Sequence, residues 1–293
     1  MICSILHERL GNILFEIAAG ASLAKQLNVP FAAYVNPGDP KYTAYVSQYK
    51  KTILRKINHL EELPLKQTEY IEPFFHYQAL PQIPHLSING YFQSEKYFDK
   101  ELVRELFTMD DDMKLYIEQK YGEILRRKPV SIHIRRGDYL KLKLLYTICT
   151  ERYYRQAIQH FPPETYYLII SDDIDWCKQH FKGEHFFFSE NESPLTDLYL
   201  QSCCRHHIIS NSTFAWWGAW LNPHPDKRVI CPDPWFQILY RKQNTKDLLP
   251  EGWIRLPVRK NMVEKIEYYY LLLKHCYRNP YKVYLEIRKR IKM

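Results

Sequence analysis

Long apolar runs are absent from this 293-residue sequence, and none approaches the roughly 20 residues of a membrane-spanning helix. Residues 1–11 lack the basic segment and apolar block of a secretory signal peptide. The seven cysteines are odd in number and show no paired metal-ligand spacing, which argues against a disulfide framework and a zinc site. These absences predict a cytoplasmic protein, either soluble or held peripherally at the inner face of a membrane.

A basic charge spread over the body of the protein is also missing. The net charge is +8, but residues 259–293 hold ten Lys or Arg against three Glu, a net +7. The rest of the chain is therefore close to neutral, which argues against a nucleic-acid-binding surface. Hydrophobic residues make up 46% of the chain and charged residues 25%, as in a globular protein with a substantial core.

The basic segment 258–293 has the pattern of an amphipathic helical tail. Apolar and aromatic side chains recur at helical spacing at Val263, Ile266, Tyr270, Leu273 and Tyr277. Two interpretations are open. The tail can lie on an anionic membrane, where basic and aromatic residues are favoured. Alternatively, it docks back on the protein and leaves its charged end in solvent.

Strands and helices alternate regularly in the second half of the chain. Short strands are predicted at 130–134, 166–170, 185–188, 207–210 and 228–231, and helices at 151–159, 195–203 and 211–221. This order predicts a parallel, doubly wound α/β sheet. The first half has predicted strands at 2–6 and near 86–89, and predicted helices at 13–27 and 98–121. Lys128-Pro129 breaks the chain, so we expect domains at 1–128 and 129–257, followed by the tail.

The stretch V-S-I-H-I-R-R-G-D-Y-L at 130–140 carries the strongest chemical signal. A buried strand ends at Arg135 and Arg136, just before a glycine turn, where open α/β sheets bind ligands. Guanidinium groups suit a diphosphate because they stay charged and bond two oxygens at once. A surface arginine pair balanced by Asp138 is the alternative interpretation. An adhesion role for the Arg-Gly-Asp triplet is weaker, since nothing marks the chain as secreted.

Two further strands of the second half end in polar pairs. Asp172 and Asp173 follow one strand, and their carboxylates can accept hydrogen bonds from ribose hydroxyls or base N–H groups. Ser212 and Thr213 begin a predicted helix, where hydroxyls either bind phosphate or cap the helix. Three marked loops at one sheet edge predict a binding site. No Asp-x-Asp motif accompanies them, so arginine rather than a metal ion is expected to neutralise a diphosphate.

Four blocks of the chain resemble the α-1,2-fucosyltransferases of glycosyltransferase family 11, bacterial type. His133–Tyr139 resembles the family's H-x-R-R-G-D-Y signature, and 210–221 resembles its S-N-S-S-F-S-W-W-G-A-W-L block. Residues 86–98 resemble its G-Y-F-Q-S-E-K-Y-F segment, and 10–15 resemble its N-terminal G-L-G-N-Q-x-F. The resemblance implies a GT-B-like architecture of two Rossmann-like domains facing each other across a cleft. The N-terminal domain would face the acceptor, and the C-terminal domain would hold the donor.

The resemblance also implies a reaction and a set of residues. L-fucose would pass with inversion from GDP-β-L-fucose to the 2-hydroxyl of a galactose-terminated oligosaccharide or lipid-linked glycan, without a metal or other cofactor. Arg135 and Arg136 would hold the pyrophosphate, and Asp172 or Asp173 would lie near ribose or guanine. The remaining nucleotide-pocket residues carried over from the motifs are Gly11, Asn12, His133, Ser212, Thr213 and Phe214.

The catalytic assignments are Arg135, Asp138 and Glu95. Either carboxylate, Asp138 or Glu95, is placed by the motifs to take the acceptor proton. Asp138 alternatively only holds an arginine, and a base is dispensable if the departing phosphate collects the proton. Arg9 and Ile13 stand where the family usually has Gly and Gln, which affects acceptor choice. A different GDP-sugar or linkage, or a non-catalytic glycan- or membrane-binding protein, remains the alternative function.

Overall fold

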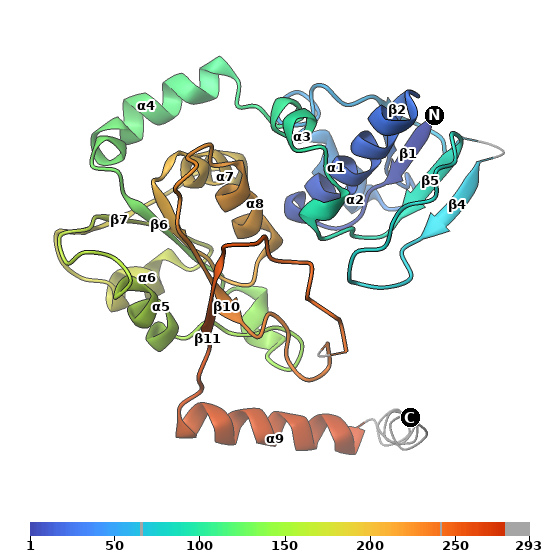
Figure 1. Ribbon diagram of the computed structural model, residues 1–293. Coiled ribbons are helices and arrows are strands. Elements are labelled where there is room, and N and C mark those ends of the chain that lie inside the picture. The colour runs from blue at the N-terminus through green and yellow to red at the C-terminus, as the bar shows by residue number, and fades with distance from the viewer. Residues whose placement is uncertain (65–66, 241, 279–293) are drawn as a thin grey trace.

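Two parallel sheets, each covered by helices, make up the body of the protein in this computed structural model (Figure 1). The structure describes residues 1–64, 67–240 and 242–278. The predicted basic end of the tail, residues 279–293, lies outside the described residues.

The first sheet has the strand order β3-β2-β1-β5-β4, and all its neighbouring strands are parallel. Its strands are β1 (Ile2–Ile5), β2 (Phe31–Tyr34), β3 (His59–Leu60), β4 (Thr68–Ile71) and β5 (Leu86–Asn89). Helix α1 (Leu10–Leu27) buries most of its length against this sheet and ends at Asn28 in the left-handed conformation. The parallel arrangement brings the carboxyl ends of β1 and β5 to one edge.

The second sheet is also fully parallel, in the order β11-β10-β9-β6-β7-β8. Its strands are β6 (Val130–Ile134), β7 (Tyr167–Ser171), β8 (Phe186–Phe188), β9 (His206–Ile208), β10 (Val229–Asp233) and β11 (Ile254–Pro257). The helices between them are α5 (Glu151–Ile158), α6 (Ile174–His180), α7 (Pro194–Cys203) and α8 (Thr213–Leu221). The predicted parallel, doubly wound sheet is therefore confirmed.

The prediction of a single helix at 98–121 is wrong. Two helices occupy this region, α3 (Lys100–Leu106) and α4 (Asp111–Arg126). Each starts at an aspartate whose carboxylate accepts a backbone N–H of the first turn, Asp99 for α3 and Asp110 for α4. Helix α4 then packs on α7, and its Tyr121 hydroxyl donates a 2.8 Å hydrogen bond to Glu192.

Aromatic packing between α1 and α8 joins the two halves of the molecule. The ring of Phe15 on α1 lies 4.6 Å from that of Trp216 and 4.9 Å from that of Trp217. The indole N–H of Trp217 also donates to the carbonyl oxygen of Gly11 at 2.9 Å. Such aromatic pairs contribute about 0.5–1.5 kcal/mol each beyond the burial of their area. Both tryptophans are fully buried, so their rings pack the two helices together.

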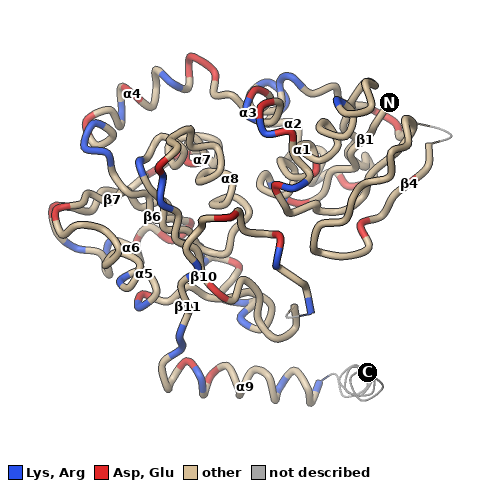
Figure 2. The backbone as a smooth tube through the Cα atoms, viewed as in Figure 1, with Lys and Arg blue, Asp and Glu red and all other residues tan. Residues whose placement is uncertain are grey.

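Helix α9 (Met262–Arg278) lies apart from the two sheets and follows β11 (Figure 1). It carries both acidic and basic residues (Figure 2), and Glu267 forms an ion pair with Lys143 of the body. One stripe of the helix exposes large apolar side chains: Met262, Val263, Ile266, Tyr269, Tyr270, Leu273 and Tyr277. Across the described ranges, no helix combines the length and apolar character that crossing a bilayer requires.

Candidate functional site

A cavity of about 550 Å³ lies between the two sheets and is lined from both sides. From the first half come the loop after β1 and the turn after β5, and from the second half come the loops after β6, β7 and β9. The cavity lining includes nine of the predicted site residues: Gly11, Asn12, His133, Arg135, Asp138, Asp172, Ser212, Thr213 and Phe214. Glu95, Arg136 and Asp173 are outside this lining.

Arg135 is fixed at the end of β6 by two carboxylates. Its guanidinium lies 2.6 Å from an Asp138 oxygen and 2.9 Å from an Asp172 oxygen. Asp172 also accepts the backbone N–H of Arg136 at 2.8 Å. These two contacts fix the guanidinium group of Arg135 at the cavity wall. Asp172, which was predicted near ribose or guanine, is thus already engaged in positioning this arginine.

Arg136 points to a different part of the molecule. Its Nε lies 2.9 Å from Asp173, and its guanidinium stacks over Trp176 at 3.9 Å from the ring centroid. Asp173 accepts the Trp176 backbone N–H at the start of α6. The structure therefore brings Arg135 to the cavity and uses Arg136 and Asp173 to anchor α6.

His133 is a buried support for the same wall. Its Nδ1 lies 2.9 Å from the Ser210 hydroxyl, and its ring lies 5.5 Å from that of Phe214. Burial, with a smaller contribution from the neighbouring Arg135 charge, lowers the pKa of His133 to about 3. The imidazole is therefore neutral at physiological pH, and it links the end of β6 to the loop after β9.

The N-terminus of α8 opens onto the cavity beside Arg135. Ser212 is the N-cap residue, yet within the described chain its hydroxyl makes no capping hydrogen bond to the helix. The free N–H groups of the first turn and the helix dipole favour an anion at this end. Gly11 of α1 abuts the same turn: a Cβ added there would lie 2.5 Å from both the Phe214 nitrogen and the Thr213 hydroxyl oxygen. Only glycine permits this close approach.

The two predicted carboxylate bases occupy different environments. Asp138 contacts two guanidinium groups, that of Arg135 and, at 3.4 Å, that of Arg9 from the first half. Glu95 accepts the Trp220 indole N–H at 3.0 Å and pairs with Lys100 at 3.0 Å. Asp138 thus faces the cavity as part of an ion-pair chain. Glu95 lies outside it and joins the two halves structurally.

Several residues that line the cavity were not predicted from the sequence. Glu8, Tyr91 and Gln93 line the first-half wall, and Tyr146 lies on the opposite wall. Tyr146 stacks on Tyr139 with ring centroids 4.4 Å apart and an interplanar angle of 8°. Tyr91 and Gln93 fall inside the G-Y-F-Q-S-E-K-Y-F block, which was a usable signal. Glu8 had no signal beyond its place in the polar loop that precedes Gly11.

The cavity can bind an anion and an uncharged polar ligand side by side. Arg135 and the N-terminus of α8 supply N–H donors for an anion at the second-half wall. Aromatic rings and hydrogen-bonding groups line the remainder, as in sites for small polar molecules. In the described part of the chain, no group of three or more His, Cys, Asp or Glu side chains is arranged to hold a metal ion.

Comparison with known proteins gives a consistent result. The family model for glycosyl transferase family 11 matches residues 74–255, more than half of the chain. Over 184 residues, 57% of this chain and 61% of the relative, it is 38% identical to an alpha-1,2-colitosyltransferase of Escherichia coli. It is 27% identical over 158 residues to galactoside alpha-(1,2)-fucosyltransferase 1 of Plecturocebus brunneus, covering 47% of this chain and 43% of that protein. The chain thus matches less than two thirds of either relative.

Among solved structures, a fucosyltransferase NodZ from Bradyrhizobium has a similar fold. Its TM-score is 0.50 at 13% sequence identity, and the match covers 80% of this chain and 94% of that one. With two parallel sheets facing each other across a cavity, the expected GT-B architecture is confirmed.

Proposed function

Because this chain belongs to glycosyltransferase family 11, we propose that it transfers L-fucose from GDP-β-L-fucose to a galactoside. The proposed acceptor atom is the 2-hydroxyl of a terminal β-galactose, and the product carries an α-1,2 linkage formed with inversion. The observation that carries the proposal is that Arg135 and the open N-terminus of α8 line the same cavity wall. A diphosphate is the anion that suits a guanidinium fork beside free backbone N–H groups.

The proposed chemistry follows from where the charges lie. When the bond between C1 of fucose and the phosphate oxygen breaks, GDP gains negative charge, which Arg135 and the α8 N–H groups can stabilise. Asp138 and Asp172 hold the guanidinium ready, so little reorganisation is needed at the moment of reaction. Arginine would thereby take the charge-neutralising part, and the reaction is proposed to need no metal ion.

A second donor is favoured by one specific observation. The curated relative at 38% identity is an alpha-1,2-colitosyltransferase. Colitose is L-fucose without its 3-hydroxyl, so a colitose donor would present the same diphosphate to Arg135 and the same reacting carbon. The two donors differ by one hydroxyl, and a cavity that hydrogen-bonds this hydroxyl discriminates strongly against the sugar that lacks it.

A GDP-release assay with a panel of β-galactosides in the presence of EDTA tests the proposal. We expect galactoside-dependent release of GDP from GDP-fucose, and an α-1,2 linkage in the product by NMR. A parallel reaction with GDP-colitose ranks the two donors by kcat/KM. Failure of both donors with every galactoside, or activity that EDTA abolishes, would contradict the proposal.

We further propose that the exposed stripe of α9 rests on an anionic membrane and brings the enzyme to lipid-linked acceptors. The stripe faces solvent, as Ile266 is 63% and Leu273 is 69% exposed. Residues 279–293, next in sequence, include five Lys or Arg and one Glu. An apolar face combined with this basic charge is the pattern of an interfacial segment.

Replacing Ile266 and Leu273 together by aspartate is expected to reduce binding to vesicles containing phosphatidylglycerol at least tenfold, because burial of both side chains is lost. Sedimentation with the vesicles measures the bound fraction. Leu115→Asp, which changes a leucine on α4 that is 57% exposed, is the control and should bind like the wild type. Equal sedimentation of all three proteins would eliminate the membrane role.

A further inference from the structure

We propose that Glu8 is the general base that takes the proton from the acceptor hydroxyl. This inference rests on the proposed function and adds a catalytic residue to it. Glu8 follows β1 and lines the first-half wall of the cavity, whereas Arg135 and the α8 N-terminus lie on the second-half wall. Inversion requires the acceptor oxygen to attack from the side opposite the leaving phosphate. A base on the first-half wall therefore stands on the correct side.

The backbone at Glu8 has an uncommon conformation. Its φ is 61°, in the left-handed region that non-glycine residues rarely adopt. Phe92, in the adjoining turn after β5, also has a positive φ of 49°. Such conformations cost of order 1–3 kcal/mol and tend to persist at functional sites. Here both lie in the loops that carry the first-half wall.

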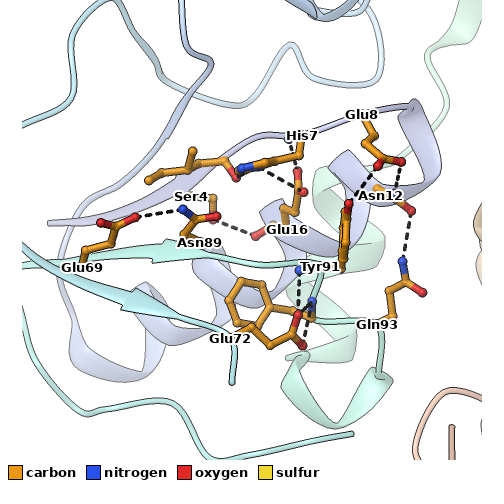
Figure 3. Close-up of polar contacts among 12 residues, drawn as sticks. Ser4, His7, Glu8, Asn12, Glu16, Glu69, Glu72, Asn89, Tyr91 and Gln93 are labelled. Carbon is orange, nitrogen blue, oxygen red and sulfur yellow. Dashed lines mark hydrogen bonds and ion pairs between the residues drawn. The ribbon is translucent and has the colours of Figure 1, made fainter. Parts of the chain in front are cut away.

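Two neutral groups fix the Glu8 carboxylate (Figure 3). The Tyr91 hydroxyl donates to it at 2.8 Å, and the Asn12 side-chain amide donates at 3.2 Å. Gln93 in turn donates to the Asn12 amide oxygen at 3.1 Å, and Glu72 accepts the Tyr91 backbone N–H at 2.8 Å. Within the described ranges, this network positions the carboxylate through neutral donors and places no cation on it.

Among the residues that the structure describes, the lack of a cationic partner sets Glu8 apart from most other carboxylates at the cavity. In the described part of the chain, Asp138 and Asp172 contact arginine, and Glu192 contacts Lys120. A carboxylate neutralised by a cation is a poorer proton acceptor. Asp197 has no described cation partner either, but it accepts a 2.6 Å hydrogen bond from Ser189 and belongs to the second half, on the leaving-group side.

The proposed step balances in atoms and charge. A lone pair of the galactose 2-hydroxyl forms the bond to C1 of fucose as the bond from C1 to the phosphate oxygen breaks, and that electron pair leaves with GDP. The hydroxyl proton passes to the Glu8 carboxylate. Because Glu8 is an exposed residue that lines the cavity, it can return the proton to solvent after the product leaves.

Glu8→Gln keeps the size of the side chain and one acceptor oxygen for the donors Tyr91 and Asn12, but it cannot take a proton. We expect kcat at saturating acceptor to fall by about 10²–10⁴-fold, with the Kd for GDP-fucose unchanged. Glu8→Asp should recover part of the loss. Glu69→Gln, which changes a carboxylate outside the cavity that accepts only the Asn89 amide among the described residues, is the control and should match the wild type.

Two outcomes would overturn the inference alone: a fully active Glu8→Gln, or one that raises only the KM for the acceptor, since Glu8 would then bind the sugar without taking its proton. Loss of turnover in Asp197→Asn but not in Glu8→Gln would likewise move the base to α7. A wild type that transfers no sugar would instead overturn the proposed function, and this inference with it. Circular dichroism confirms that each variant is folded.

Discussion

Replacing Arg135 by lysine is expected to lower turnover with GDP-fucose by two or more orders of magnitude. The change keeps the positive charge but removes the fork that bonds two oxygens at once. Loss of one such electrostatic stabiliser costs about 2.7–4 kcal/mol of transition-state energy. Asp138 and Asp172 would also lose a matched partner at the cavity wall. Steady-state kinetics at saturating acceptor measure the effect.

Arg136→Lys distinguishes the role of Arg136 from that of the adjacent Arg135. Arg136 is directed to Asp173 and Trp176, away from the cavity lining, so its replacement should weaken the packing of α6 and reduce turnover much less. Equal loss of turnover in both variants, with both proteins folded, would show that the diphosphate is held by both guanidinium groups.

Gly11→Ala is expected to abolish activity and to destabilise the protein. Alanine normally favours a helix over glycine by about 1 kcal/mol. Here the added Cβ would lie 2.5 Å from the Phe214 backbone nitrogen and 2.7 Å from the Thr213 backbone carbon. Backbone atoms cannot rotate away, so α1 and α8 must separate, at about 1–3 kcal/mol for overpacking. The same movement displaces the anion-binding end of α8.

Urea denaturation and GDP-fucose turnover measure the two effects of this substitution. Gly38→Ala is the matched control, because the three atoms nearest to its added Cβ all belong to the Asn36 side chain, at 3.1 Å or more. It should retain wild-type stability within about 0.5 kcal/mol, the usual range for surface changes. A Gly11→Ala protein with wild-type stability and turnover would contradict the described contact between α1 and α8.

Much of the second half was predictable because its signals are local. The apolar strand at 130–134 and the polar residues that follow β6, β7 and β9 share one sheet edge by the rule for parallel strands. The first half was harder to predict. Strands β2 and β4 are only four residues long, and no turn chemistry marks the short β3. Their places in the sheet are fixed by the pairing of β2 with β1, of β3 with β2 and of β4 with β5, which no local pattern records.

The site residues also divide into those that local sequence predicts and those that it does not. Arg135, Ser212 and Thr213 were found because each follows a strand end. The separate directions of Arg135 and Arg136, and the use of Asp172 and Asp173 to hold them, depend on contacts 36 and 37 residues apart. The contact of Glu8 with Tyr91 spans 83 residues. Sequence spacing alone does not specify which distant residues pair, so these roles could be assigned only from the folded structure.

The most direct test of the central claim is calorimetric titration of GDP-fucose into the wild type and Arg135→Lys. If Arg135 and the α8 N-terminus form the diphosphate site, the wild type should bind one equivalent. Arg135→Lys should then bind at least tenfold more weakly, a difference of about 1.4 kcal/mol. No binding to the wild type, or equal affinity in both proteins, would contradict the assignment of this cavity to a GDP-sugar donor.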